Sequence, residues 1–247
     1  METTKYIVIF IAIMTGLVAV ALTGLRQSTK TIAEKNEEVF NKRAILGSVS
    51  TFLDKPVAEF SDEEVLALFS NDIEQYVLDM GGEVIEEGES VADQINMAKE
   101  AQKPEEDRSL PLYVFNSDDE KLYILSVRGR GLWDAIWGTV ALREDLVTVA
   151  GASFDHAGET PGLGAEIKDN PAFSAQFSGK RIFSTMNGEY TAVLVRKGGA
   201  RNPEYEVDGI SGATVTADGV TEMIKRGIKY YEPYLEQFRN ADALGMR

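Results

Sequence analysis

A long apolar run near the N-terminus constrains this chain most. The segment from Tyr6 to Leu25 carries no charged residue and lies between Lys5 and Arg26. At about 1.5 Å of rise per residue, a helix of this length spans about 30 Å, the thickness of a bilayer's hydrocarbon core. Ala19-Val20-Ala21 also resembles a signal-peptide cleavage site. We favour a retained transmembrane helix, because the run is long for a signal peptide and continues past that site.

The flanking charges do not settle the orientation of this helix. Only Lys5 precedes the run, and Glu2 offsets it, whereas Arg26, Lys30 and Lys35 follow it. Positive residues normally stay on the cytoplasmic side, so charge bias gives no support for an N-in, C-out arrangement.

The overall charge and composition exclude several classes of function. The net charge of -15 argues against nucleic-acid binding and against a polybasic contact with anionic lipid, because both need a basic surface. The chain has no cysteine and one histidine, His156. This composition excludes thiolate clusters, disulfides and most zinc sites in this chain, and we assign no metal-binding residue. The acidic surface is interpreted as a source of solubility.

Changes in composition predict three parts. Residues 1–28 form the membrane anchor, residues 29–107 form a helical connecting region, and residues 108–247 form a domain that carries the function. The acidic stretch around Pro104 is the expected linker into that domain.

The sequence of the connecting region predicts two helices followed by a segment whose secondary structure is ambiguous. An imperfect apolar face begins at Thr31, and Pro56 is expected to end that helix. Ser61 and Glu64 have the spacing of a capping box, which predicts the start of a second helix. Residues 73–84 are ambiguous, and Gly81-Gly82 predicts a turn within them.

The last part of the chain predicts an α+β fold, in which flanking helices cover a mostly antiparallel sheet. Short apolar runs bounded by turn residues are typical of strands, and they cover residues 112–115, 122–127, 135–142, 147–154 and 190–195. A short helix is expected from Asn170 and includes Phe177. A final amphipathic helix runs to about Phe238, with Pro233 either kinking or ending it.

The stretch from Asp208 to Thr216 is where we expect the chemistry. Its glycines let a bulky group approach the backbone, and the amphipathic helix follows directly. The start of a helix presents free N–H groups, which suit an anionic phosphate. Ordinary helix capping by Ser or Thr explains the same pattern, and it is favoured on spacing alone.

Three sequence blocks together resemble a known family. Ser211-Gly212-Ala213-Thr214 resembles the flavinylation motif of FMN-binding domains, and Glu159-Thr160-Pro161-Gly162-Leu163-Gly164 resembles the loop that accompanies it. Gly129-Arg130-Gly131-Leu132-Trp133 is similar to a block in the C subunit of bacterial Na+-translocating NADH:quinone oxidoreductases. The blocks occur in the family's order and cover most of the second half.

The resemblance implies that a flavin transferase joins FMN to Thr214 through a phosphoester. Thr216 is the second choice, and is otherwise expected to cap the helix or to bond the phosphate. Ser211, with Gly212 and Ala213, is expected to shape the turn. Asp208 does not suit an anionic cofactor, and we expect it to assist the transferase or to bond backbone N–H groups.

The other two blocks imply further contacts with the flavin. Thr160 offers a hydroxyl, Leu163 an apolar surface, and the backbone beside Gly162 and Gly164 offers N–H groups. Trp133 either packs on the isoalloxazine ring or fills the core.

Several charged residues have two interpretations each. Arg128 and Arg130 either balance an acidic surface or neutralise a phosphate. Lys197 either contacts the flavin or its phosphate, or is a solvated lysine. His156 is interpreted as a loop or surface histidine, although a flavin contact stays open.

The function implied by the resemblance is electron transfer by FMN inside a membrane complex that oxidises NADH, reduces quinone and exports Na+. No dinucleotide-binding fingerprint follows a predicted strand, so no complete active site is expected in this chain and NADH is assigned to another subunit. The expected partners are the other subunits, the flavin transferase and the bacterial inner membrane, with the large domain on the periplasmic side. The alternatives are the related subunit of a ferredoxin:NAD+ oxidoreductase, against which the Gly-Arg-Gly-Leu-Trp block weighs, and a cofactor-free anchored scaffold.

Overall fold

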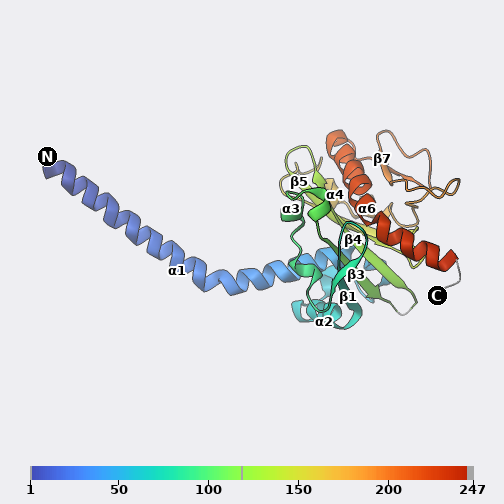
Figure 1. Cartoon of the computed structure of the whole chain (residues 1–247). Coiled ribbons are helices and arrows are strands. Elements are labelled where there is room, and N and C mark those ends of the chain that lie inside the picture. The colour runs from blue at the N-terminus through green and yellow to red at the C-terminus, as the bar shows by residue number, and fades with distance from the viewer. Residues whose placement is uncertain (1, 118, 244–247) are drawn as a thin grey trace. The chain divides into compact units, whose positions relative to one another are not determined.

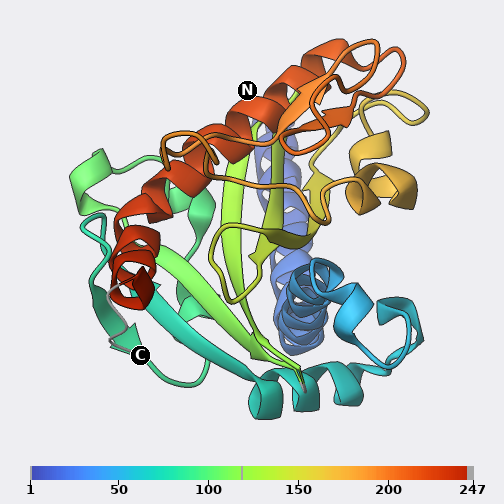
Figure 2. The ribbon, with the colours of Figure 1, turned by 90° about the vertical axis from the view of Figure 1, so that its right-hand side faces the viewer.

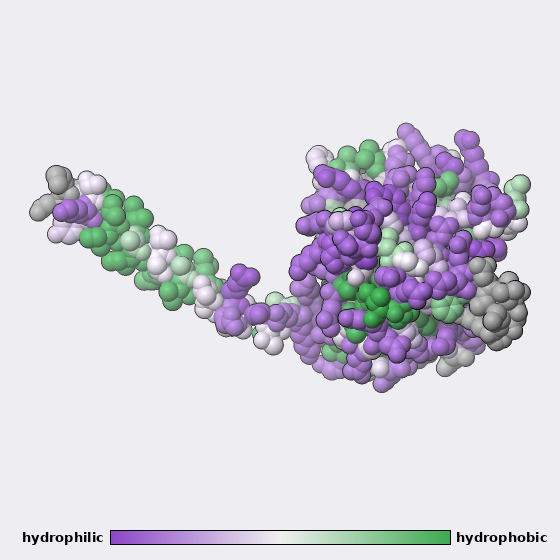
Figure 3. Space-filling model, in the orientation of Figure 1, coloured by the Kyte–Doolittle hydropathy of each residue, from purple (hydrophilic) through white to green (hydrophobic). Residues whose placement is uncertain are grey.

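The computed structural model describes residues 2–117 and 119–243 (Figure 1), and the chain divides into two compact units, Met1–Asn41 and Lys42–Arg247. Helix α1 (Glu2–Gly47) runs through the first unit and ends in the second. Its apolar N-terminal part stands out in Figure 3, and its side chains are exposed. Among the described residues, it is the one helix long and apolar enough to cross a membrane.

A six-stranded antiparallel sheet forms the centre of the second unit. Its order is β2-β1-β3-β4-β5-β6, and every neighbouring pair is antiparallel. The six strands are β1 (Ile73–Leu78), β2 (Val84–Glu87), β3 (Leu110–Asn116), β4 (Lys121–Arg130), β5 (Ala135–Leu142) and β6 (Val149–His156). Two further strands, β7 (Leu194–Arg196) and β8 (Glu206–Asp208), pair in parallel beside this sheet.

Helices of very different lengths surround the sheet. The α-helices are α2 (Asp62–Asp72), α3 (Met97–Glu100), α4 (Glu166–Asp169), α5 (Pro171–Ala175) and α6 (Thr214–Ala243). The described residues also contain four single-turn 3-10 helices, at Ser50–Phe52, Val57–Glu59, Ala92–Gln94 and Glu105–Asp107. Figure 2 shows α6 lying diagonally across one face of the sheet.

Both faces of the sheet are buried, which explains the continuous apolar runs in its strands. On the α6 side, Leu112 and Val114 join the main hydrophobic cluster. On the opposite side, Tyr113 meets Phe69 of α2 edge to face, with 6.1 Å between ring centroids. Alternate residues of β3 thus pack against different layers.

Helix α6 packs tightly against β4. A Cβ on Gly219 would lie 2.4 Å from the carbonyl oxygen of Arg130, so only glycine permits this approach. Farther along the helix, the buried hydroxyl of Tyr231 donates to the carbonyl of Pro111 at 2.8 Å. These contacts fix where α6 begins relative to the C-terminal end of β4.

The predicted α+β class is confirmed, including the long apolar N-terminal helix and the antiparallel sheet. The capping box at Ser61 and Glu64 is present, and Gly82 forms the predicted turn with a φ of 82°. Residues 29–107 supply strands as well as helices, because the ambiguous segment contains β1 and ends where β2 begins. The two boundaries between the three predicted parts stay predictions.

Four predicted ends of elements are wrong. Helix α1 stops at Gly47 rather than continuing to Pro56, because the chain turns there to lie against β6, where Ser153 leaves no room for a side chain on Gly47. The predicted strand at 190–195 is reduced to β7, with one isolated bridge at Tyr190. Phe177 follows α5 rather than lying in it, and packs 5.0 Å from the ring of Phe154. Pro233 lies inside α6, which continues past Phe238 to Ala243.

Candidate functional site

The predicted phosphate-binding stretch forms the tight turn before α6. Thr214 is the first residue of the helix and is partly exposed, whereas Ser211 and Gly212 are exposed. Gly212 has a φ of 77°, which disfavours any residue with a side chain. Ala213 is buried, and its carbonyl accepts the N–H of Ala217 at 2.9 Å. The first N–H groups of α6 before Ala217 have no partner inside the helix and are available to an acceptor.

The three sequence blocks come together around this turn. A Cβ on Gly212 would lie 2.6 Å from Cδ2 of Leu163, so the second block packs directly on the first. The indole Nε1 of Trp133 donates to the hydroxyl of Thr160 at 3.1 Å. Residues separated by about eighty positions thus form one continuous surface.

Glu159 connects the blocks below that surface. Its side chain is 5% exposed, and its carboxylate accepts the hydroxyl of Thr216 at 2.6 Å and the backbone N–H of Trp133 at 2.9 Å. Burial raises the pKa of Glu159, but hydrogen bonds from Thr216, Trp133 and Asp134 outweigh it and hold the pKa below its ordinary value. The carboxylate is therefore ionised at neutral pH.

The two candidate threonines have different surroundings. Thr216 is 1% exposed, and its hydroxyl is engaged with Glu159. Thr214 is partly exposed, and its hydroxyl makes no hydrogen bond to the part of the chain that the structure describes. An enzyme that modifies a hydroxyl needs access to it, so the geometry favours Thr214.

Apolar side chains cover the surface beside Thr214. Leu132, Trp133, Leu163 and Val215 are each more than two-fifths exposed. Exposed apolar groups of this size are typical of binding surfaces. A flat aromatic ring tethered at Thr214 would shield them from water, so the residues present fit an isoalloxazine ring and its phosphate.

Two of the charged candidates, Arg128 and Asp208, have partners outside the three sequence blocks. The guanidinium of Arg128 stacks over the ring of Trp137, 5.7 Å from its centroid. Lys197 is exposed, and its backbone lies beside Gly209, since the N–H of Gly209 bonds the carbonyl of Arg196 at 2.8 Å. Asp208 accepts the N–H of Ala200 at 2.7 Å, so it joins two loops instead of bonding its own turn.

Glu159 and His156 acquire roles that the sequence did not assign. Nδ1 of His156 accepts the backbone N–H of Glu159 at 3.1 Å, so His156 supports the loop that precedes Thr160. The available signal was the position of Glu159, an acidic residue at the first place of an otherwise uncharged block.

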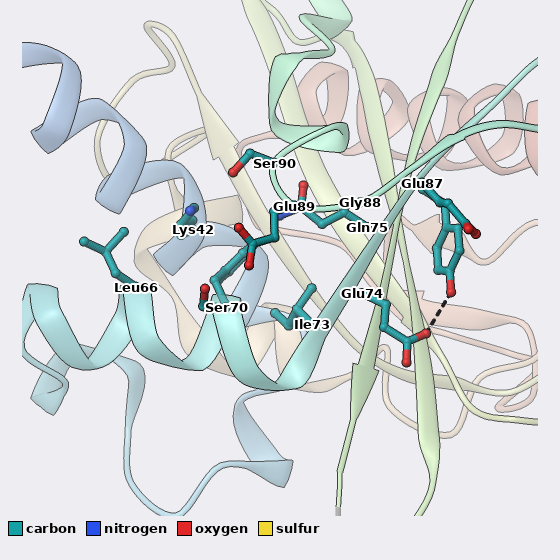
Figure 4. Close-up of a pocket in the computed structure, with 12 residues that line it drawn as sticks. Lys42, Leu66, Ser70, Ile73, Glu74, Gln75, Glu87, Gly88, Glu89 and Ser90 are labelled. Atoms are coloured by element: carbon teal, nitrogen blue, oxygen red, sulfur yellow. Dashed lines mark hydrogen bonds between the residues drawn. The ribbon is translucent and has the colours of Figure 1, made fainter.

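A separate hollow of about 480 Å³ lies between α2, β1 and the loop after β2. Lys42, Glu74 and Glu89 contribute to its lining, and Figure 4 shows the hydrogen bond from Tyr76 to Glu74 at its edge. None of the predicted site residues lines it. It is therefore distinct from the surface around Thr214.

Comparison with known proteins identifies the class of the domain. Residues 131–229 match the FMN-binding domain family, and this segment contains Trp133, the loop at Glu159–Gly164 and the turn at Thr214. Fold and site together define an FMN-binding domain that follows one long apolar helix.

Relatives across the whole chain narrow this class further. The C subunit of the Na(+)-translocating NADH-quinone reductase of Vibrio alginolyticus is 31% identical, over 92% of this chain and 90% of the relative. The same subunit of Neisseria meningitidis is 32% identical with the same coverage. The chain belongs to the family of the C subunits of Na(+)-translocating NADH-quinone reductases, as the sequence resemblance predicted.

Solved structures agree with this assignment. The crystal structure of the C subunit of this reductase from Parabacteroides distasonis has a TM-score of 0.71 and 34% identity, and the match covers 83% of this chain and 96% of that one. The crystal structure of NqrC from Shewanella oneidensis shares the fold, with a TM-score of 0.68 at 23% identity, over 84% and 99% of the two chains.

Proposed function

We propose that this chain transfers electrons through FMN joined by a phosphoester to Thr214, as a subunit of a Na+-translocating NADH-quinone reductase. Family membership and the FMN-binding domain match support the cofactor and the complex. The observation that carries the attachment site is the contrast between the partly exposed Thr214 and the buried Thr216.

The attachment step replaces a proton with a phosphorus atom. Oγ1 of Thr214 would attack the flavin-side phosphorus of a flavin dinucleotide, the P–O bond of its pyrophosphate would break with release of a nucleoside monophosphate, and a base would take the hydroxyl proton. The flavin dinucleotide, as the co-substrate of a flavin transferase, would supply the activated phosphate. This chain contributes the accessible hydroxyl and the helix start that stabilises negative charge beside it.

Different residues would hold the phosphate and the isoalloxazine ring of the cofactor. The first turn of α6, with Ser211, offers donors to the phosphate, and Lys197 lies in the neighbouring loop. Trp133 and Leu163 offer an apolar surface to the ring.

The loop at 160–164 would contact the polar edge of the flavin. Thr160 offers its hydroxyl, and the backbone beside Gly162 and Gly164 offers N–H groups. The hydroxyl of Thr160 already accepts the indole N–H of Trp133, which fixes the two residues relative to one another.

FMN, when bound, supplies chemistry that accepts and releases electrons singly, which suits a relay between centres. Trp133 and Leu163 are exposed, so residues that would hold the ring lie where a partner protein can approach them. Because the sequence lacks a dinucleotide fingerprint, NADH oxidation is assigned to another subunit.

Co-expression with a flavin transferase tests the attachment. Wild-type protein and Thr216→Ala are expected to show in-gel flavin fluorescence, whereas Thr214→Ala is expected to show none. Fluorescence that persists in Thr214→Ala and disappears in Thr216→Ala would move the site. A colourless wild-type chain would favour a cofactor-free scaffold.

The apolar part of α1 supports a single-pass location in the bacterial inner membrane, and we propose that the large unit lies on the periplasmic side. Because the chain has no cysteine, one introduced thiol reports on its own position. Asp169→Cys places a thiol on an exposed position of the large unit. Labelling of intact cells by a membrane-impermeant maleimide is expected, and labelling only after permeabilisation would contradict the orientation.

A further inference from the structure

Glu159 is buried at the place where three segments of the site meet. Its Oε2 accepts the hydroxyl of Thr216 in the first turn of α6, and its Oε1 accepts the backbone N–H of Trp133 after β4. Its own N–H is held by His156 at the end of β6. One carboxylate therefore ties the helix start, the tryptophan turn and the loop at 159–164 to one another.

Two glycines of the motif blocks leave room for this carboxylate. A Cβ on Gly131 would lie 2.5 Å from Oε1 of Glu159. A Cβ on Gly164 would lie 2.3 Å from Oε2 of Glu159 and 2.7 Å from Oγ1 of Thr216. Real Cβ atoms do not approach polar atoms so closely, and the hydrogen bonds prevent the carboxylate from moving aside. These glycines serve the packing of Glu159 rather than the flexibility of their loops.

We propose that Glu159 is a positioning residue, which orients Trp133 and the first turn of α6 around the flavin on Thr214, and that Gly131 and Gly164 are needed to accommodate it. The inference rests on the proposed function for the flavin, but the positioning itself concerns residues of this chain alone. Glu159 makes no hydrogen bond to the Thr214 hydroxyl, and it contacts Trp133 through the backbone N–H rather than the exposed ring, so it acts through Thr216 and the backbone of Trp133.

The chemistry of the carboxylate explains why an acidic residue suits this place. A carboxylate is acceptor-only when ionised, so it accepts from a hydroxyl and a backbone N–H at once. Hydrogen bonds to a charged acceptor are stronger than those between neutral groups. A glutamine of the same size would replace one acceptor oxygen with an NH2 donor, and the charge that strengthens both bonds would be lost.

Two variants and one control test the inference in the full-length chain in detergent. Glu159→Gln keeps the size but removes the charge, and Gly164→Ala keeps the charge but fills its space. Glu166→Gln is the matched control, because Glu166 lies on neighbouring α4 and makes none of these hydrogen bonds. Far-UV circular dichroism first establishes that each variant is folded.

Amide hydrogen exchange of the flavin-free chain measures the positioning directly. Segments 131–135 and 159–165, and the first turn of α6, are expected to exchange about tenfold faster in Glu159→Gln and in Gly164→Ala, and to be unchanged in Glu166→Gln. Exchange that stays at the wild-type rate in both variants would overturn the proposal. An increase spread evenly over β1–β6 would also overturn it, because it would show general destabilisation.

The visible circular dichroism of flavin-loaded protein supplies a readout that a purely structural residue would not change. We expect both variants to alter the flavin's band shape, through a reoriented Trp133, and the control to preserve it. An unaltered band in both variants would overturn the link to the ring. If wild-type protein takes up no flavin, the proposed function fails, while the exchange experiment on the flavin-free chain still decides the positioning.

Discussion

Replacing each of the two threonines near the start of α6 by valine should have different effects. Thr216→Val should lower the stability of the domain, and Thr214→Val should prevent flavin attachment. Thr216→Val removes a buried hydroxyl that donates to the Glu159 carboxylate at 2.6 Å. Valine has nearly the same shape, so the change isolates the hydrogen bond. Thr214→Val removes a partly exposed hydroxyl that bonds no other described residue.

The expected magnitude follows from the charged acceptor. A hydrogen bond to a charged group contributes about 1.5–3 kcal/mol to the free energy of unfolding. For a domain of roughly 150–250 residues, each kcal/mol shifts the Tm by roughly 2–4 °C. Thr216→Val should therefore lower the Tm by about 3–12 °C, and Thr214→Val should change the free energy of unfolding by less than about 0.5 kcal/mol.

Thermal unfolding of the full-length chain, followed by far-UV circular dichroism at neutral pH, measures both effects. The same samples are analysed for flavin after co-expression with a transferase. We expect Thr216→Val to be less stable but flavinylated, and Thr214→Val to be stable but flavin-free. A Thr216→Val variant within about a degree of wild type, or a larger loss in Thr214→Val, would refute the assigned hydrogen bond.

Three other predictions concern how the fold holds the site. Tyr231→Phe removes the hydroxyl that donates to the buried carbonyl of Pro111, and it should lower the free energy of unfolding by about 1–3 kcal/mol, measured with urea. An unchanged free energy of unfolding would show that the carbonyl finds another donor. Ser61→Ala removes the cap of α2 and should cost about 1 kcal/mol, measured in the same way. Hydrogen bonds from the backbone of Asn202 and Arg201 lower the pKa of Glu206 from 4.5 to about 2, so its contribution to stability is present above pH 4.5 and is lost as the pH falls towards 2. Glu206→Gln should reduce the pH dependence of the Tm between these pH values. A pH dependence equal to that of wild type would contradict the lowered pKa of Glu206.

The elements with strong local signals were predictable from the sequence. The capping box at Ser61, the strand at 135–142 and the turn at Gly81-Gly82 each depend on residues adjacent in the chain. The apolar run at 6–25 likewise predicted the exposed part of α1. Local propensity and periodicity are sufficient for elements of this kind.

Elements that depend on distant partners were less predictable. Residues 73–84 were ambiguous because β1 is defined by its pairing with β3, more than thirty residues later. The strand at 190–195 was too long because its apolar residues pack on neighbouring segments without forming a ladder. Helix α1 ends early for a similar reason, since contact with β6 determines where the chain turns.

The candidate site likewise has features that the local sequence predicted and features that depend on distant residues. The three motif blocks were recognisable, and they do lie together in the fold. Their common support was not recognisable, because the bonds from Glu159 to Thr216 and to the backbone of Trp133 join residues 57 and 26 positions apart. Periodicity says nothing about contacts over such distances. The structure also separated Thr214 from Thr216 by burial, which their spacing could not do.

The mass of the mature protein tests the central claim most directly. The chain is expressed with a flavin transferase, its intact mass is measured, and the modified peptide is sequenced by fragmentation. We expect one FMN phosphoester on the wild-type chain, located on Thr214 and retained in Thr216→Val. An unmodified wild-type mass, or a phosphoester located on Thr216, would contradict it.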